Sequence, residues 1–239
     1  MFFYELHLHT AETSRCGNSS AKDMVRDYYE RGFSGVVVTD HFVNGNSYSA
    51  RWCEQNAAWN ERMDIFLKGY KEALKEGGKL KFPVYFGWEY TYRGTGEDYL
   101  ILGTKPEHLY TEFEDCDRWT IEQLIDKVHE LGGIVIRAHP YRIADYMKIS
   151  CIERPGLDID AVEAFNAGNG QESYNLRAVE FARNEHKPMT AGSDTHRTTN
   201  NAAYYVGFEE KPADDKDLCR QIKEGRAVLY HYGEKIILQ

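Results

Sequence analysis

Histidine, aspartate and glutamate recur where short apolar runs of this chain end. These positions are His7-Leu8-His9, Asp40-His41, Glu89, His139 and Asp194-Thr195-His196. Residues two apart on a strand point to the same side, so His7 and His9 can reach one cation about 2.0 to 2.2 Å from each nitrogen. A lone buried histidine or aspartate is usually a satisfied core residue. Burying this many ionisable groups together without a cation would cost several kcal/mol each, so the pattern predicts a metal centre.

The apolar runs alternate with segments of helical periodicity from end to end, which predicts an α/β fold with parallel strands. The predicted strands are 2–9, 36–38, 82–88, 99–102, 134–136, 161–165 and 188–191, with a less regular tail containing 204–208 and 227–232. The predicted helices are 23–31, 57–76, 120–131, 174–184 and 214–224, with Ser20 and Thr120 as N-caps. Because the carboxyl ends of parallel strands share one face, the polar groups are expected to meet there.

Four motifs in this order resemble the PHP (polymerase and histidinol phosphatase) domain of metal-dependent phosphoesterases. They are His7-Leu8-His9-Thr10, Val38-Thr39-Asp40-His41, Gly87-Trp88-Glu89 with Ala138-His139-Pro140, and Gly192-Ser193-Asp194-Thr195-His196. The resemblance covers nearly the whole chain and implies one domain over residues 1–239. It further implies a distorted seven-stranded (β/α) barrel with two or three divalent ions, zinc, manganese or iron, over its C-terminal face.

Carried over residue by residue, the resemblance implies the following metal ligands. His7, His9, Glu89 and Asp194 surround a first ion, Glu89 bridges to a second ion that His139 also holds, and His41 and His196 serve a third. Three-metal members have a further histidine shortly after the first motif, which this chain lacks. Either Cys16 or Glu12 therefore completes the third site, or that site is weak or empty. Asp98 stands where many members place a histidine and is expected to be a metal ligand.

The implied chemistry is phosphoester hydrolysis by a metal-activated hydroxide, with Glu89, Asp194 and His196 as catalytic residues. Three arginines next to the motifs are candidates for binding the substrate phosphate, because a guanidinium matches phosphate geometry. They are Arg15, Arg142 and Arg197. Asp40 and Glu163 are expected to orient imidazole rings, and Tyr141 to line the mouth of the site.

Composition narrows the alternatives. The chain has 239 residues, 29 Lys and Arg against 38 Asp and Glu, and a net charge of −9, which disfavours a non-specific grip on nucleic acid. No apolar run approaches the roughly 20 residues that cross a bilayer, and the start lacks a basic signal region. The five cysteines (16, 53, 116, 151 and 219) form no CxxC motif and are expected to be mostly free thiols. A cytoplasmic protein is expected.

These observations favour a small phosphorylated substrate and leave the oligomeric state open. A nuclease-like activity on nucleic acid ends and a non-catalytic metal-binding module are kept as alternatives. Hydrolysis of C–N bonds, as in amidohydrolases, ranks behind phosphoester cleavage because Glu89 occupies the bridging place where those enzymes usually carry a lysine.

Overall fold

A computed structural model describes residues 1–53, 56–92, 95–143, 154–200 and 202–238. Its strands form one sheet in the order β10-β9-β8-β1-β2-β3-β4-β5-β6-β7. The strands are β1 (Phe2–Glu5), β2 (Gly35–Val38), β3 (Val84–Tyr92), β4 (Glu97–Leu102), β5 (Ile134–Arg137), β6 (Ala161–Asn166), β7 (Met189–Gly192), β8 (Tyr204–Phe208), β9 (Val228–His231) and β10 (Glu234–Lys235). The α/β class is therefore confirmed.

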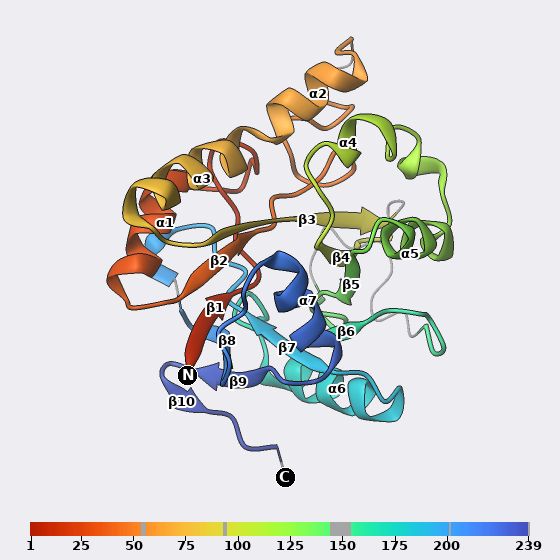
Figure 1. Cartoon of the computed structure of the whole chain (residues 1–239). Coiled ribbons are helices and arrows are strands. Elements are labelled where there is room, and N and C mark those ends of the chain that lie inside the picture. The colour runs from red at the N-terminus through yellow and green to blue at the C-terminus, as the bar shows by residue number, and fades with distance from the viewer. Residues whose placement is uncertain (54–55, 93–94, 144–153, 201, 239) are drawn as a thin grey trace.

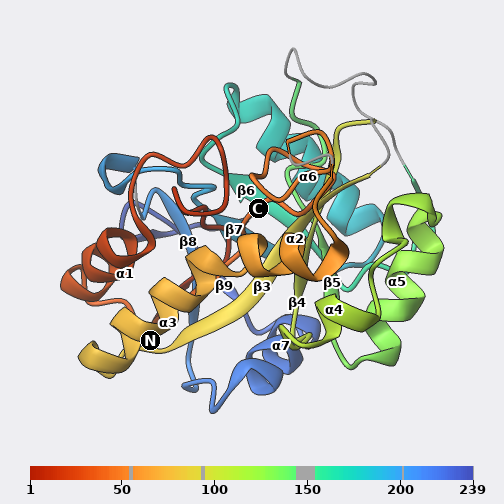
Figure 2. The same cartoon turned by 90° about the horizontal axis from the view of Figure 1, so that it is seen from above.

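The helices are α1 (Ala21–Glu30), α2 (Trp59–Phe66), α3 (Lys68–Leu80), α4 (His108–Thr111), α5 (Ile121–Glu130), α6 (Glu172–Asn184) and α7 (Asp215–Lys223), with short 3-10 turns at Cys116–Arg118 and Thr198–Asn200. Most helices lie around the outside of the curled sheet (Figures 1 and 2), whereas α7 packs against its other face, where Leu218 and Ile222 join a cluster with Val37. Apolar side chains from both layers form the core, which is rich in aromatic residues such as Trp88, Phe42 and Phe113. No helix in the described ranges has the length and apolar character needed to cross a bilayer.

The sheet curls so that the chain following β1 meets the chain following β7. Leu8 forms a parallel bridge with Thr195, and the His9 amide donates to the Thr195 carbonyl at 3.0 Å. The expected count of seven strands is not confirmed, because the sheet has ten strands. The difference lies in the tail, where β8 pairs antiparallel with β1 and extends the sheet through β9 and β10.

Strand β4 differs from the predicted parallel arrangement. It runs antiparallel to both β3 and β5. A parallel connection needs a crossover of a dozen or more residues, whereas β3 ends at Tyr92 and β4 begins at Glu97, so these strands form a hairpin. Glu89 consequently lies inside β3 rather than at its end. Asp98, near the amino end of β4, opposes Thr91 and so lies beside the carboxyl ends of the parallel strands.

The helix predicted over 57–76 is two helices, α2 and α3, that meet at Leu67. The hydroxyl of Thr13 enters this junction: it donates to the Phe66 carbonyl at 2.8 Å and accepts from the Gly69 amide at 3.0 Å. A side chain inserted in this way replaces the helical hydrogen bonds and separates the two segments. Helix α3 then continues past Gly77 to Leu80. The predicted caps are confirmed, since Ser20 and Thr120 accept from the third residue of their helices.

Candidate metal centre

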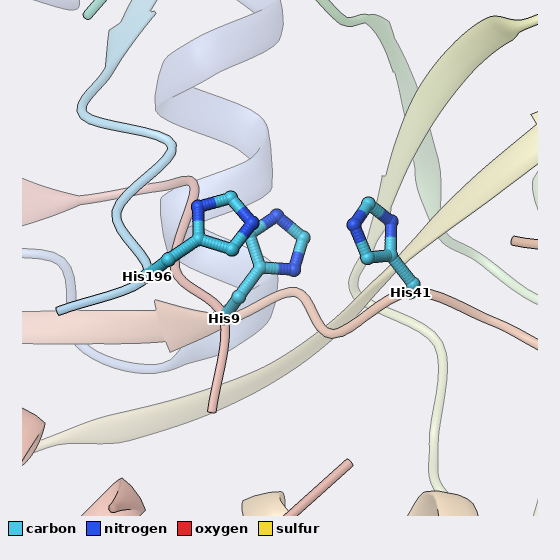
Figure 3. Close-up of side chains that lie close together, drawn as sticks. All are labelled: His9, His41 and His196. Carbon is cyan, nitrogen blue, oxygen red and sulfur yellow. The ribbon is translucent and has the colours of Figure 1, made fainter. Parts of the chain in front are cut away.

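The side chains singled out from the sequence come together at one mouth of the curled sheet. His7 and His9 follow β1, and His41 follows β2. Glu89 lies on β3, and Asp98 lies on the neighbouring strand β4, where it opposes Thr91. His139 follows β5, and Asp194 and His196 follow β7. Four trios have ligand atoms within 4.8 Å of one another: His7, His9 and Glu89; His7, His139 and Asp194; Glu89, Asp98 and His139; and His9, His41 and His196. Figure 3 shows the last trio, in which three separate loops bring their imidazoles together.

Polar atoms at the centre of this group lack hydrogen-bond partners among the described residues. They are His7 Nε2, His9 Nε2, His41 Nδ1 and Glu89 Oε2, all buried. His7 Nε2 lies 3.2 Å from Glu89 Oε1, and His9 Nε2 lies 3.2 Å from Asp194 Oδ1. His41 Nδ1 also lies 2.5 Å from Glu89 Oε2, so the imidazole nitrogens and the carboxylate oxygens face one another. Gathering so many buried ionisable groups is costly unless a cation lies between them. The donor set of imidazole nitrogens and carboxylate oxygens fits zinc, manganese or iron.

Glu163 hydrogen-bonds to two of the candidate ligands, His7 and His139. One carboxylate oxygen lies 2.9 Å from His7 Nδ1, and the other accepts from the His139 amide at 3.0 Å. Asn166 donates to the same carboxylate at 2.8 Å. A carboxylate that accepts from Nδ1–H keeps the Nε2 lone pair of an imidazole free for a metal. This placement agrees with the orienting role expected for Glu163.

Asp40 is linked to His9 through the hydroxyl of Ser14, a residue that the sequence did not single out. Its Oδ1 accepts from the Ser14 hydroxyl at 2.6 Å, and Ser14 Oγ lies 3.2 Å from His9 Nδ1. The Thr10 amide and hydroxyl also donate to Asp40, each at 2.7 Å. Ser14 follows a motif by only five residues and carries no signal that separates it from an ordinary loop serine. Asp40 therefore orients His9 indirectly, by way of Ser14.

The backbone at two candidate ligands is strained. His139 has φ of 27° and Asp194 has φ of 48°, a region that favours glycine. Each residue lies two positions beyond the end of its strand, β5 or β7, and the left-handed turn redirects the chain at that point. Strained non-glycine residues persist where the surrounding structure holds them and cluster at functional sites.

Burial and the neighbouring charges shift the pKa values of several groups in the cluster. Burial alone would raise the pKa of Glu89, but His41 and His7 hold it well below the usual range. Burial and the neighbouring His41 and His196 lower the pKa of His9, which keeps its imidazole neutral and able to ligate. Burial and the nearby Glu89 raise the pKa of Asp98 to about 6. Two carboxylates this close repel unless a cation lies between them.

Cys16, not Glu12, faces His41 and His196. Cys16 lines the same cavity as these two histidines, and although burial would raise the pKa of its thiol, the neighbouring His196 and His41 lower it to about 6. Glu12 is used elsewhere, since its carboxylate accepts from the Ala21 amide at 2.9 and 3.1 Å at the start of α1. Cys53, Cys116 and Cys219 are also free thiols, and Cys151 lies outside the described residues.

A cavity of about 1210 Å³ opens over the cluster. His41, Glu89, Asp98, Asp194 and His196 contribute to its lining. This exceeds the roughly 300 to 1,000 Å³ typical of small-molecule pockets, so the cavity can admit substrates larger than a simple phosphate ester. Buried Tyr141, expected at the mouth, lies in a separate small pocket next to Arg177.

The three candidate arginines differ in position. Arg197 is exposed and lines the cavity. Arg142 also lines it, but its guanidinium lies 2.5 Å from Asp194 Oδ2 and 2.6 Å from Asn166 Oδ1. Arg15 stacks over the Trp52 ring at 4.5 Å and lines a neighbouring pocket instead. Arg142 and Arg197 therefore both line the cavity over the cluster, whereas Arg15 lines the neighbouring pocket.

The C-terminal part of the chain is similar to a known protein family. A family model described as PHP-associated matches residues 172–227. No curated protein sequence matches the chain.

Solved structures share the fold at low sequence identity. One is a two-domain protein from Bacteroides vulgatus containing a predicted PHP-like metal-dependent phosphoesterase, with 13% identity and a TM-score of 0.69 over 99% of this chain and 66% of that one. An amidohydrolase from Chromobacterium violaceum, with bound sulfate and no metal, has 12% identity and a TM-score of 0.57 over 95% and 97%. The lesion-specific endonuclease PfuEndoQ from Pyrococcus furiosus has 13% identity and a TM-score of 0.57 over 93% and 56%.

Proposed function

We propose that the chain is a member of the PHP family and a metal-dependent hydrolase that cleaves phosphoester bonds of a small phosphorylated substrate. The observation that carries the proposal is the convergence of buried imidazole nitrogens and carboxylate oxygens, from His7, His9, His41 and Glu89 among others, beneath an open cavity.

In this proposal His7, His9, Glu89 and Asp194 hold one divalent ion, and Glu89, Asp98 and His139 hold a second. The two carboxylate oxygens of Glu89 face different partners, since Oε1 lies 3.3 Å from His139 Nε2 and Oε2 lies 3.5 Å from His9 Nε2. Such a carboxylate can bridge two cations and offset their repulsion. Bound divalent ions supply a hydroxide nucleophile at neutral pH and neutralise charge on the phosphoryl group.

The chain's own side chains orient the substrate in this scheme. Arg197 contacts the phosphoryl oxygens from the cavity wall, while Arg142 keeps Asp194 in place through their 2.5 Å contact. Glu163 fixes the tautomer of His7. The scheme needs no serine or cysteine nucleophile.

Nuclease activity is the second candidate. It is favoured by the size of the cavity and by the fold shared with an endonuclease. The net charge of −9 opposes tight binding to a phosphate backbone, so we rank it second.

The test is turnover of p-nitrophenyl phosphate, its diester and short DNA oligonucleotides with manganese and with zinc. Glu89→Gln, with a neutral amide that cannot bridge two dications, is expected to lose about 100-fold or more of the metal-dependent rate. The exposed Glu180→Gln on α6 is the matched control and is expected to keep the wild-type rate. A folded Glu89→Gln with unchanged turnover contradicts the bridging role. Wild-type protein inactive on every phosphoester contradicts the function, and cleavage of oligonucleotides alone selects the second candidate.

A further inference from the structure

A neighbouring pocket of about 550 Å³ adjoins the cavity over the metal centre. Trp52 lines both the cavity and this pocket, and its side chain is 54% exposed. No step of the proposed function uses this tryptophan. Because one side chain is common to both linings, a substrate that occupies the cavity can extend past Trp52 into the pocket. The rest of the pocket is lined by Glu12, Arg15, Tyr48, Cys53, Ile65 and Lys68.

Backbone contacts fix Arg15 between the first motif and the segment that follows β2. The Arg15 amide donates to the Asn46 carbonyl at 2.9 Å, and Ser14 and Ser47 form an antiparallel bridge between the same two segments. The guanidinium of Arg15 then stacks over the Trp52 ring, 4.5 Å from its centroid. Since Asn46 and Trp52 both line the larger cavity, the position of Arg15 is tied to the wall of that cavity.

The Arg15 guanidinium is positioned to bind an anion. A stacked guanidinium keeps its N–H groups at its edge, where they can donate to an oxyanion. The stacked guanidinium of Arg51 also forms an ion pair with Asp117 at 3.3 Å. That of Arg154 forms an ion pair with Glu97 at 2.9 Å. Within the described ranges no carboxylate pairs with Arg15 in this way, so its donors are available to a ligand.

Lys68 brings a second positive charge to the neighbouring pocket. It is the first residue of α3, and the next amide, that of Gly69, donates to the Thr13 hydroxyl at 3.0 Å, which holds this end of the helix against the first motif. The carboxylate of Glu12 faces α1 instead, where it accepts from the Ala21 amide at 2.9 Å. In a chain with a net charge of −9, two cations that no described carboxylate neutralises favour an anionic ligand.

We propose that the neighbouring pocket binds a second anionic group of the substrate, a phosphate or a carboxylate, through Arg15 and Lys68. The substrate is then a phosphoester with two anionic groups. Its scissile group lies over the metal centre, and its remainder passes Trp52 to reach the pocket. This inference rests on the proposed function only for the position of the scissile group. Arg15 keeps the anion-binding chemistry expected from the sequence, but for a different part of the substrate.

Tryptophan fluorescence tests the pocket without any catalysis. Metal-free protein in chelator is titrated with inorganic phosphate at constant ionic strength. The emission of the exposed Trp52 is expected to change, because the anion binds the guanidinium that stacks on its ring. Trp52→Phe is expected to abolish this signal. Arg15→Gln is expected to weaken the binding about 10-fold or more, since a charge-assisted hydrogen bond is lost.

Lys71→Gln is the matched control for this titration, because Lys71 lies on the same helix as Lys68 but outside the described lining of the pocket. It is expected to bind phosphate as the wild type does. Thermal melts check that each variant folds. A wild type without a response, or a response that Arg15→Gln leaves unchanged, overturns the inference.

Discrimination between substrates tests whether the pocket serves the metal centre. The probes are the monophosphates of straight-chain diols from ethanediol to octanediol, each compared with the bisphosphate and with the carboxyalkyl phosphate of matching length. At one chain length or more, the second anionic group is expected to lower the KM of the wild type about 10-fold, and the arm that shows this drop identifies the group. Arg15→Gln and Lys68→Gln are expected to lose most of the difference, and Lys71→Gln to keep it.

The results separate this inference from the proposed function. Equal KM values at every chain length, or a difference that survives both substitutions, refute the pocket and leave the hydrolase standing. An equal rise in the KM of all probes in Arg15→Gln also refutes the inference, because it places Arg15 at the scissile phosphate. A protein that binds phosphate through Arg15 but hydrolyses no probe supports the anion site and refutes only the proposed function.

Discussion

Replacing Glu163 with glutamine tests whether one buried carboxylate sets the metal affinity of the centre. Glu163 receives three hydrogen bonds, from His7 Nδ1, the His139 amide and the Asn166 side chain, at 2.9, 3.0 and 2.8 Å. All three partners are donors when His7 is a ligand through Nε2. Glutamine has only one oxygen, so its NH₂ group must face at least one of them.

Both orientations of the substituted amide are unfavourable. With NH₂ toward His7, the imidazole must place its proton on Nε2, which blocks the lone pair that faces Glu89. With NH₂ toward His139 and Asn166, buried donors face a donor, at about 1 to 3 kcal/mol for each unsatisfied group. The side chain has no room to turn away, because even an added Cβ on Gly192 would lie 2.6 Å from Glu163 Oε1. We expect affinity for Mn²⁺ or Zn²⁺ to fall about 10- to 100-fold, roughly 1.4 to 2.7 kcal/mol.

Metal affinity is measured by calorimetry or by competition with a chromogenic chelator, with Glu180→Gln as the control that removes one exposed charge on α6. A thermal melt in chelator checks the fold. If Glu163→Gln binds metal within about twofold of wild type while the control behaves normally, then Glu163 does not set the His7 tautomer and the reasoning is wrong.

Three further outcomes are expected. Gly69→Ala should lower the free energy of unfolding in urea by about 1 to 3 kcal/mol, since its Cβ would lie 2.0 Å from Thr10 Oγ1. Gly78→Ala in the same helix, where an added Cβ meets open space, should raise that free energy by about 0.5 to 1 kcal/mol. Equal effects of the two substitutions would contradict the close packing at Gly69. Burial raises the pKa of Glu5 to about 7, so between about pH 5 and 7 the folded state holds a proton that the unfolded state has lost. Metal-free wild type should therefore lose stability relative to Glu5→Gln as pH rises through this range, by roughly 1 kcal/mol per pH unit. A constant difference in stability would show that Glu5 does not titrate there. Zinc or manganese should raise the melting temperature by mass action, about 2.7 kcal/mol of stabilisation at 100 times Kd, and chelator should reverse it; no shift would exclude tight binding.

Much of the centre was predictable because its chemistry is local in sequence. Each cluster of ligand-type residues directly follows or ends an apolar run, so position along the chain indicated position in the sheet. His7 and His9 follow β1, and Asp194 and His196 follow β7. The helix caps at Ser20 and Thr120 were equally readable, because a cap depends on residues three apart.

Other features were decided by contacts between distant segments. Ser14 joins Asp40 to His9, and Thr13 separates α2 from α3, yet neither residue differs in sequence from a common loop hydroxyl. Arg15 lies beside a motif but stacks on Trp52, because the path of the loop and not its distance in sequence sets its direction. The ten-stranded sheet likewise depends on where the tail pairs, which short-range periodicity does not specify.

By itself the sequence determined the α/β class, the chemical types of the ligands and the edge of the sheet where they gather, because these follow from residue type and from strand and helix periods. Only the tertiary structure decided that Cys16 and not Glu12 lines the cavity with His41 and His196, since both lie in one short loop and the Glu12 carboxylate accepts from the Ala21 amide instead. The same holds for Asp98, which reaches the centre because β4 reverses direction in a hairpin. Side-chain direction in loops and the direction of a strand are set by packing between segments, and that information is spread over the whole chain.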